Sequence, residues 1–299
     1  MRFLVIGGAG FIGSHLVDRL LAEGHGVEVV DDLSTGSLAN LAEARRADGE
    51  LKIHNLDAAS ADVDSLLGLR RPDAIYHLGL VPRGSVSAGQ VGAAFERALT
   101  ALEAARHHGI SRIVAALPAS VLYGQPSVAA LPVREAEFVP RGVRGVVARA
   151  IVDLLAIYRE RSMIEFSALA MASVYGPRQR PDGGVVAAFV DAHSSGRPPV
   201  MFGDGRQTRD FVYIDDVVDA LVRAGDRSSG LVINVGTGEQ TSLRDLWARV
   251  GGGLGQEPRF EQPRPDDLAR FAVSPVRARI HLGWSPWTDL DTGLRHIQG

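Results

Sequence analysis

The sequence has no cysteine, which excludes disulfides, thiolate metal ligands and a cysteine nucleophile. Acidic and basic residues nearly balance, at 35 and 32 of 299, so neither nucleic acid nor a membrane surface is expected as a partner. No apolar run approaches a membrane span, and glycines and charges break the apolar start, unlike a signal peptide. No metal-ligand motif is identified. We therefore expect a globular protein of the reducing cytoplasm, without a metal centre.

What is present at the start is a short apolar run, a glycine turn and a helical apolar pattern. Gly7 allows the tight turn, Gly10 lets a pyrophosphate approach the backbone, and Gly13 lets the helix pack closely on its strand. The unpaired N–H groups and the positive dipole at the start of that helix favour phosphate. The alternative interpretation is a glycine turn that serves only tight packing.

Two acidic residues follow the second apolar run, residues 27–30. Asp31 and Asp32 lie where the acceptor for a ribose hydroxyl is expected after such a glycine turn. A carboxylate at this position accepts a hydrogen bond from a free 2′-hydroxyl and repels a 2′-phosphate. The beginning of the chain therefore predicts bound NAD in preference to NADP.

Apolar runs alternate with helical patterns through the first part of the chain. Strands are expected at 3–6, 27–30, 51–54, 74–78, 112–116 and 164–169. Helices are expected after the glycine turn and at 37–46, 60–69, 92–108 and 143–161. The strands show little alternation of polar residues, as when helices cover both faces of a sheet. This order predicts an α/β fold with a Rossmann-type doubly wound parallel sheet.

The pattern of the sequence changes near residue 171, where turns rich in glycine and proline become frequent. We expect a dinucleotide-binding domain at 1–170 and a smaller α/β substrate-binding domain at 171–299. The segment 209–235 is expected to return to the main sheet. A ligand cleft is expected between the two parts, at the carboxyl ends of the strands.

Several further motifs stand in a fixed order along the chain. Besides the glycine turn, they are Asp31–Gly36, His77–Leu78, Leu122–Gly124, Ser173–Arg178, Phe202–Val217, Arg264–Asp267 and Leu282–Pro286. In order and spacing the chain resembles the extended short-chain dehydrogenase/reductase (SDR) family. The resemblance is strongest to its NAD-dependent sugar-nucleotide epimerases and dehydratases of the UDP-glucose 4-epimerase type, and it covers essentially the whole chain.

The resemblance implies NAD, a nucleoside-diphosphate sugar and a homodimer formed through the long helix and its neighbour. The implied cofactor residues are Gly7, Gly10, Phe11, Ile12, Gly13, Asp31, Asp32, Ser34, Thr35, Gly36, Asp57, Leu78, Gly79, Leu80 and Arg149. The implied substrate residues are Ser173, Gly184, Val185, Phe202, Arg209 and Arg264. The two arginines match the clamp on the diphosphate, because a guanidinium binds phosphate oxygens with two donors. A structural ion pair is the alternative for Arg209, and simple exposure is the alternative for Arg264.

The sequence departs from the family at the reacting centre. The family pattern implies a Tyr-x-x-x-Lys pair, whose tyrosine is the general base, and a Ser or Thr that binds the reacting oxygen. These positions hold Ala119, Gly145 and Arg149. Lys52 is the only lysine, and it does not follow any of the five tyrosines at the required spacing. No Tyr-x-x-x-Lys therefore exists in the chain.

Two hypotheses remain open from the sequence. The first is an NAD-dependent epimerase, dehydratase or reductase with a rebuilt acid/base set, drawn from Ser120, Tyr123 and His77. A packing role is the alternative for each of the three. Arg149 could hold the nicotinamide ribose but cannot exchange protons near neutral pH. The second hypothesis is a degenerate NAD-binding homologue that acts as a binding or partner subunit.

Overall fold

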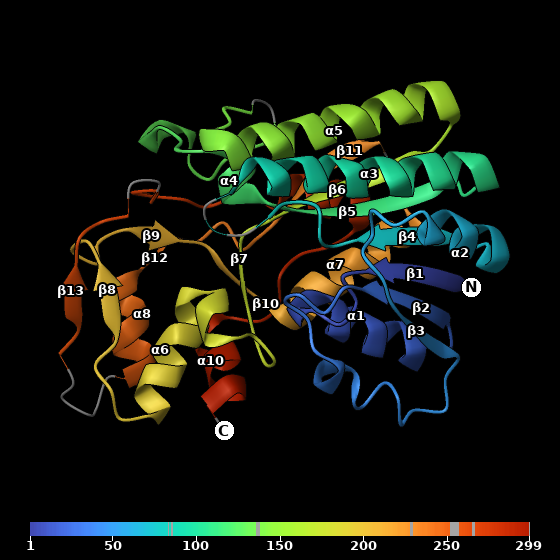
Figure 1. The fold of residues 1–299 in the computed structure, drawn as a ribbon. Helices are drawn as coiled ribbons and strands as arrows, with labels where there is room; N and C mark the ends of the chain where they lie inside the picture. The colour runs from blue at the N-terminus through green and yellow to red at the C-terminus, as the bar shows by residue number, and fades with distance from the viewer. Residues whose placement is uncertain are drawn as a thin grey trace.

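A parallel sheet of seven strands, in the order β11-β6-β5-β4-β1-β2-β3, forms the centre of the molecule (Figure 1). The computed structural model describes residues 1–82, 84, 86–135, 138–227, 230–251, 257–264 and 267–298. The strands are β1 (Arg2–Ile6), β2 (Gly26–Asp31), β3 (Leu51–Asn55), β4 (Ala74–His77), β5 (Arg112–Pro118), β6 (Glu165–Met171) and β11 (Leu231–Val235). The doubly wound α/β prediction is confirmed.

Helices cover both faces of this sheet, as the apolar strands require. One face carries α1 (Phe11–Ala22) and α7 (Ile214–Asp226), and the other carries α2 (Asp62–Arg70), α3 (Ala88–His108) and α5 (Gly142–Ser162) (Figure 1). Successive residues of β1 point to opposite faces, so Val5 enters the first core and Leu4 the second. Both side chains are fully buried.

The smaller elements lie beyond the carboxyl ends of the central strands (Figure 1). The helices here are α4 (Ala119–Tyr123), α6 (Val185–Ser194), α8 (Leu243–Gly251) and α10 (Leu290–Gln298), with short 3-10 turns η2 (Val128–Ala130) and η3 (Pro181–Gly183). Helix α9 (Val276–Leu282) instead packs against the edge strand β11 and helix α7. Three pairs of short strands complete this part: β7 (Ser173–Tyr175) with β10 (Phe211–Tyr213), β9 (Thr208–Arg209) with β12 (Thr241–Ser242), and β8 (Val200–Phe202) with β13 (Arg259–Glu261). The division into two domains at residue 170 stays a prediction.

Two expected helices have different bounds in the structure. The helix expected at 37–46 is wrong, because only the 3-10 turn η1 (Leu38–Leu41) forms. The backbone N–H of Ser37 and the side-chain amide of Asn40 both donate to the carbonyl of Ala9, at 3.0 and 2.9 Å. These bonds tie the segment to the glycine turn in place of a regular helix.

Helix α3 begins at Ala88, four residues earlier than expected, because the glycines at its start hide the helical pattern. A capping box starts it: the Ser87 side chain accepts from the backbone of Gln90, and the Gln90 side chain accepts from the backbone of Ser87.

No helix among the described residues is long and apolar enough to span a membrane.

A buried carboxylate joins the smaller part to the sheet. Asp210 accepts hydrogen bonds from the backbone N–H groups of Thr237, Gly238 and Val273, at 2.9, 3.0 and 3.1 Å, and from the Thr237 hydroxyl at 2.7 Å. Burial raises the pKa of Asp210, and these donors oppose that shift. Asp210 therefore fixes the segment that follows Arg209 against the turn after β11.

Candidate active site

The glycine turn after β1 is packed so that no side chain fits at its third glycine. A Cβ on Gly13 would lie 2.1 Å from the carbonyl oxygen of Gly7, which itself has φ +82°. Gly10 is the N-cap of α1 and supplies no side-chain cap, so no N-cap side chain occupies the first N–H groups of the helix. A turn with this geometry fits a dinucleotide pyrophosphate.

Asp31 closes the same turn at the end of β2. Its carboxylate accepts from the backbone N–H groups of Ala9 at 2.8 Å and Leu33 at 2.9 Å. A Cβ on Gly36 would lie 2.9 Å from Asp31 Oδ1, so the expected Gly36 is sterically required there. Burial raises the pKa of Asp31, and the two N–H donors oppose that rise.

An arginine that was not predicted from the sequence contacts Asp57 and Asp32, two acidic residues that were expected to bind the adenosine part of NAD. Arg97 of α3 donates from Nε and Nη2 to the two carboxylate oxygens of Asp57, at 2.8 and 3.1 Å, and from Nη2 to Asp32 at 3.2 Å. Hydrogen bonding to Arg97 lowers the pKa of Asp57. Asp32 also accepts from the backbone N–H of Ser34 at 2.9 Å, while Thr35 is exposed.

The remaining expected cofactor residues line the same end of the sheet. Leu78 follows β4, and its Cβ lies 3.5 Å from the position of a Cβ on Gly7. Leu80 is buried, whereas a Cβ on Gly79 would meet no atom within 4 Å. Phe11, at the start of α1 before Ile12, contacts the His15 ring edge to face at 5.9 Å.

The expected position of the catalytic tyrosine is closely packed. A Cβ on Gly145 would lie 3.0 Å from both the Cβ of Pro140 and the carbonyl oxygen of Val121. These distances are tighter than ordinary Cβ contacts, so a side chain at position 145 requires its neighbours to shift by a few tenths of an ångström. Ala119 is fully buried in α4, and Ser120 beside it is half-buried.

Tyr123 is held inside a hydrogen-bond network. Its hydroxyl donates to Asn234 Oδ1 at 2.7 Å, and Asn234 Nδ2 donates to the carbonyl of Val133 at 2.9 Å. The ring stacks on Phe138, and burial raises the pKa of Tyr123 well above its usual range. A tyrosine that stays protonated and donates in this way is poorly suited to remove a proton from a substrate.

The structure also defines the surroundings of Arg149 and His77. Arg149 Nε lies 3.1 Å from both carboxylate oxygens of Asp153, and its guanidinium lies 5.1 Å from the centre of the Phe138 ring. His77 is fully buried, and neither ring nitrogen has a hydrogen-bond partner among the described residues. Burial lowers the pKa of His77 to about 4, so its ring is neutral at pH 7.

The structure brings together two of the expected substrate residues, Phe202 and Arg264. The Arg264 guanidinium lies over the Phe202 ring, 3.9 Å from its centre. Arg209 donates to the carbonyls of Thr208 and Leu268, at 2.8 and 2.7 Å, and pairs with the carboxylate of Asp267.

The ion pair of Arg209 therefore forms with a residue distant in the sequence, and its neighbour Asp210 binds elsewhere. Burial lowers the pKa of Arg209, and Asp267 opposes that shift. Gly184 is the N-cap of α6, which begins at Val185, and Ser173 begins β7. Loop residues 265–266 lie outside the described residues.

Comparison with known proteins agrees with this geometry. The family described as NAD dependent epimerase/dehydratase matches residues 3–236. The chain is 41% identical over 309 residues to the UDP-glucose 4-epimerase of Mycolicibacterium smegmatis, across 98% of this chain and 96% of that protein. The solved UDP-glucose 4-epimerase of Thermotoga maritima with UDP-glucose has a TM-score of 0.91 and 31% identity, covering 99% and 97% of the chains. The Thermus thermophilus UDP-glucose 4-epimerase in complex with NAD has a TM-score of 0.86 and 31% identity, covering 100% and 99%.

The chain belongs to the NAD-dependent epimerase/dehydratase family, within the extended SDR enzymes that act on sugar nucleotides. Its cofactor is NAD, and the observed glycine turn with Asp31 fits that cofactor. The prediction of an NAD-dependent enzyme is confirmed, and the alternative of a non-catalytic binding homologue is not favoured.

Proposed function

We propose that the protein alters the configuration or oxidation state of a UDP-sugar, with epimerisation as the first reaction to test. The relatives named above are UDP-glucose 4-epimerases, and one solved relative contains UDP-glucose. The observation in this chain that supports the proposal most is that a complete glycine turn occurs together with the pairing of Arg264 and Phe202. NAD, when bound, supplies reversible uptake of a hydride.

The diphosphate clamp is proposed to consist of Arg209 and Arg264. Two backbone carbonyls and Asp267 hold the Arg209 guanidinium in one orientation, which lowers the entropy lost when it binds phosphate. The Arg264 guanidinium rests on an aromatic face, and its planar group suits two-donor binding of phosphate oxygens. Gly184 and Val185, at the start of α6, are proposed to border the nucleobase and its ribose.

The acid/base chemistry is proposed to run without a tyrosine base. The close packing around Gly145 disfavours that side chain, and the Tyr123 hydroxyl donates to Asn234. We propose that Ser120, half-buried at the carboxyl end of β5, binds the reacting oxygen of the sugar. Arg149 is proposed to bind the nicotinamide ribose and to supply positive charge. Since a general base contributes about 10²–10⁴-fold in rate, slow turnover is expected.

A homodimer through α3 and α5 is proposed for the assembled enzyme. Leu99 of α3 and three residues of α5, Val143, Val146 and Ile157, are exposed apolar side chains, at 39%, 54%, 58% and 45% exposure. Exposed apolar residues gathered on adjacent helices favour association. Sedimentation of the purified protein tests this, and a monomer at micromolar concentration would contradict it.

The proposed function is tested by adding UDP-, GDP- and dTDP-sugars to the purified protein while recording reduced-nicotinamide absorbance. A change with a UDP-sugar is expected. Arg209→Ala should weaken sugar-nucleotide binding and leave NAD affinity unchanged. Bound NAD without an absorbance change or product for any sugar nucleotide would contradict the proposal. Equal loss of both ligands in Arg209→Ala would indicate a folding defect.

A further inference from the structure

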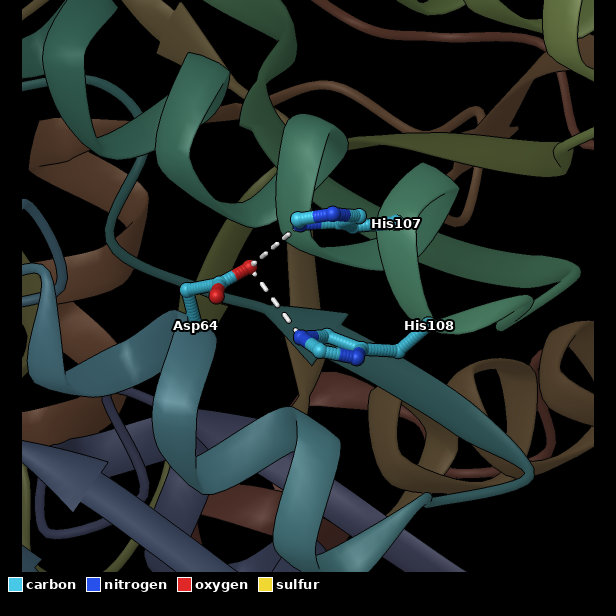
Figure 2. A group of neighbouring side chains, drawn as sticks. All are labelled: Asp64, His107 and His108. Carbon is cyan, nitrogen blue, oxygen red and sulfur yellow. Dashed lines mark hydrogen bonds and ion pairs between the residues drawn. The ribbon is translucent and has the colours of Figure 1, made fainter.

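Three potential metal ligands converge on the outer surface where α2 meets the end of α3 (Figure 2). They are Asp64 of α2 and the neighbouring His107 and His108 of α3. Asp64 Oδ1 lies 3.1 Å from His108 Nε2 and 3.6 Å from His107 Nδ1. All three ligand atoms lie within 4.8 Å of one another. No role in cofactor or substrate binding was assigned to these residues.

The spacing suits a small tetrahedral ion. A metal with ligands at about 2.0–2.1 Å in tetrahedral geometry has neighbouring ligand atoms roughly 3.3 Å apart. The two measured separations lie on either side of this value. Imidazole nitrogens with one carboxylate favour borderline ions such as Zn²⁺ over Mg²⁺ or Ca²⁺, which prefer oxygen ligands.

The fold holds the His108 ring in place against α2. A Cβ on Gly68 would lie only 2.7 Å from His108 Cε1 and 3.1 Å from its Nδ1. The glycine therefore leaves the space that the ring occupies, one turn of helix after Asp64. The side chain of His108 is 21% exposed, while that of His107 is 71% exposed and leaves room for a water ligand.

The position at the end of α3 also favours a cation. Helix α3 ends at His108, and Gly109 caps it in the left-handed conformation. The negative end of the helix dipole lies at this terminus, and it stabilises positive charge there. Arg97, in the adenosine part of the active site, lies ten residues before His107 on α3, about 15 Å along the helix axis. The cluster is therefore separate from the NAD site.

We propose that Asp64, His107 and His108 form a surface site for Zn²⁺ or a similar divalent transition metal, linking α2 to the end of α3. His107 binds through Nδ1, His108 through Nε2 and Asp64 through one carboxylate oxygen, with water completing the coordination. The site has a stabilising role, because an ion that binds the folded chain shifts the folding equilibrium by mass action. It takes no part in the sugar-nucleotide reaction.

The test is calorimetric titration of the NAD-loaded protein, without an affinity tag, with ZnCl₂ at pH 7.5. One saturable ion per chain is expected, with a rise in melting temperature. His108→Gln and Asp64→Asn should each weaken Zn²⁺ binding about 10-fold or more. Co²⁺ should give the visible absorption bands of tetrahedral coordination in the native protein and lose them in His108→Gln.

Two further variants separate this site from general binding by histidines. His281→Gln, on the exposed end of α9, should leave Zn²⁺ affinity unchanged. Gly68→Ala keeps all three ligands but displaces the His108 ring, and it should weaken Zn²⁺ binding. Circular dichroism without metal confirms that each variant is folded. Absence of saturable binding, or equal affinity in native protein and His108→Gln, would overturn the proposal and leave a hydrogen-bonded surface cluster only.

Discussion

A Cβ placed on Gly145 would lie 3.0 Å from the Cβ of Pro140. The segment that contains Pro140 also closes over the end of α4, since a Cβ on Gly124 would lie 2.5 Å from the carbonyl oxygen of Val139. The chain before α5 therefore packs where the family pattern implies a tyrosine. A side chain at position 145 therefore requires this segment to move as well.

Restoring the family residues should fail for this reason. Gly145→Tyr combined with Arg149→Lys should destabilise the fold by about 1–3 kcal/mol, the usual cost of overpacking. It should not raise the turnover of UDP-sugars. Urea denaturation and a turnover assay measure the two effects. Gly92→Ala is the matched control: a Cβ there meets nothing within 4 Å, so the change should be neutral or stabilising. A large gain in turnover from the double variant would show that the space exists.

Tyr123→Phe should alter stability and leave chemistry intact. The change removes the donor to Asn234 Oδ1 and leaves a buried acceptor unsatisfied. A loss of about 1–3 kcal/mol in the free energy of unfolding is expected, with unchanged kcat per folded molecule. Ser120→Ala should show the reverse, with lower kcat and nearly unchanged stability. If Tyr123→Phe instead lowers kcat 100-fold or so without destabilisation, Tyr123 is the acid/base group.

The stability of the protein should fall in mild acid because of His77. Its pKa is about 4 in the folded protein, through burial, and near 6.5 when unfolded. The unfolded state therefore takes up the proton first, so stability falls as pH decreases from about 6.5 to about 4 and levels off below. The full effect is on the order of 3 kcal/mol. Denaturant unfolding of His77→Phe should show a flatter profile over this range. An unchanged profile would mean that another group causes the loss.

The ion pair of Arg97 and Asp57 should affect the pH dependence of stability at lower pH than His77 does. Arg97 lowers the pKa of Asp57, so this stabilisation is present above the unfolded pKa and disappears as pH falls through the folded one. Because both side chains are partly exposed, Arg97→Met should cost less than about 1 kcal/mol at pH 7. The same variant should weaken NAD binding, since Asp57 loses its orientation. Calorimetric titration with NAD measures this, and unchanged affinity would remove Arg97 from the cofactor site.

The residues that local rules govern could be predicted from the sequence. Gly7, Gly10, Gly13 and the acid at Asp31 depend on a strand, a turn and a helix within one short segment, and the structure places them as that pattern requires. The apolar runs likewise identified six of the seven strands of the central sheet, because helices bury most of these residues on both faces. The seventh strand, β11, lies at the end of the segment 209–235 that was expected to return to this sheet.

The contacts that join distant segments could not be predicted. Three contacts depend on the tertiary path of the chain: the two-donor hydrogen bond of Arg97 to Asp57, the ion pair of Arg209 with Asp267, and the approach of Pro140 to Gly145. The roles of the individual cofactor and substrate residues stay predictions. The homodimer and the cytoplasmic location also stay predictions. The proposed metal ligands could not be predicted either, because Asp64 and the two histidines lie far apart in the sequence.

We propose that this protein turns over a sugar nucleotide with NAD although it has no Tyr-x-x-x-Lys pair. Proton NMR of the purified protein with UDP-galactose and NAD tests this most directly, with Ser120→Ala measured alongside. Slow formation of UDP-glucose is expected, and it should be slower still in the variant. Bound NAD together with no conversion of UDP-galactose or any other UDP-, GDP- or dTDP-sugar would contradict it.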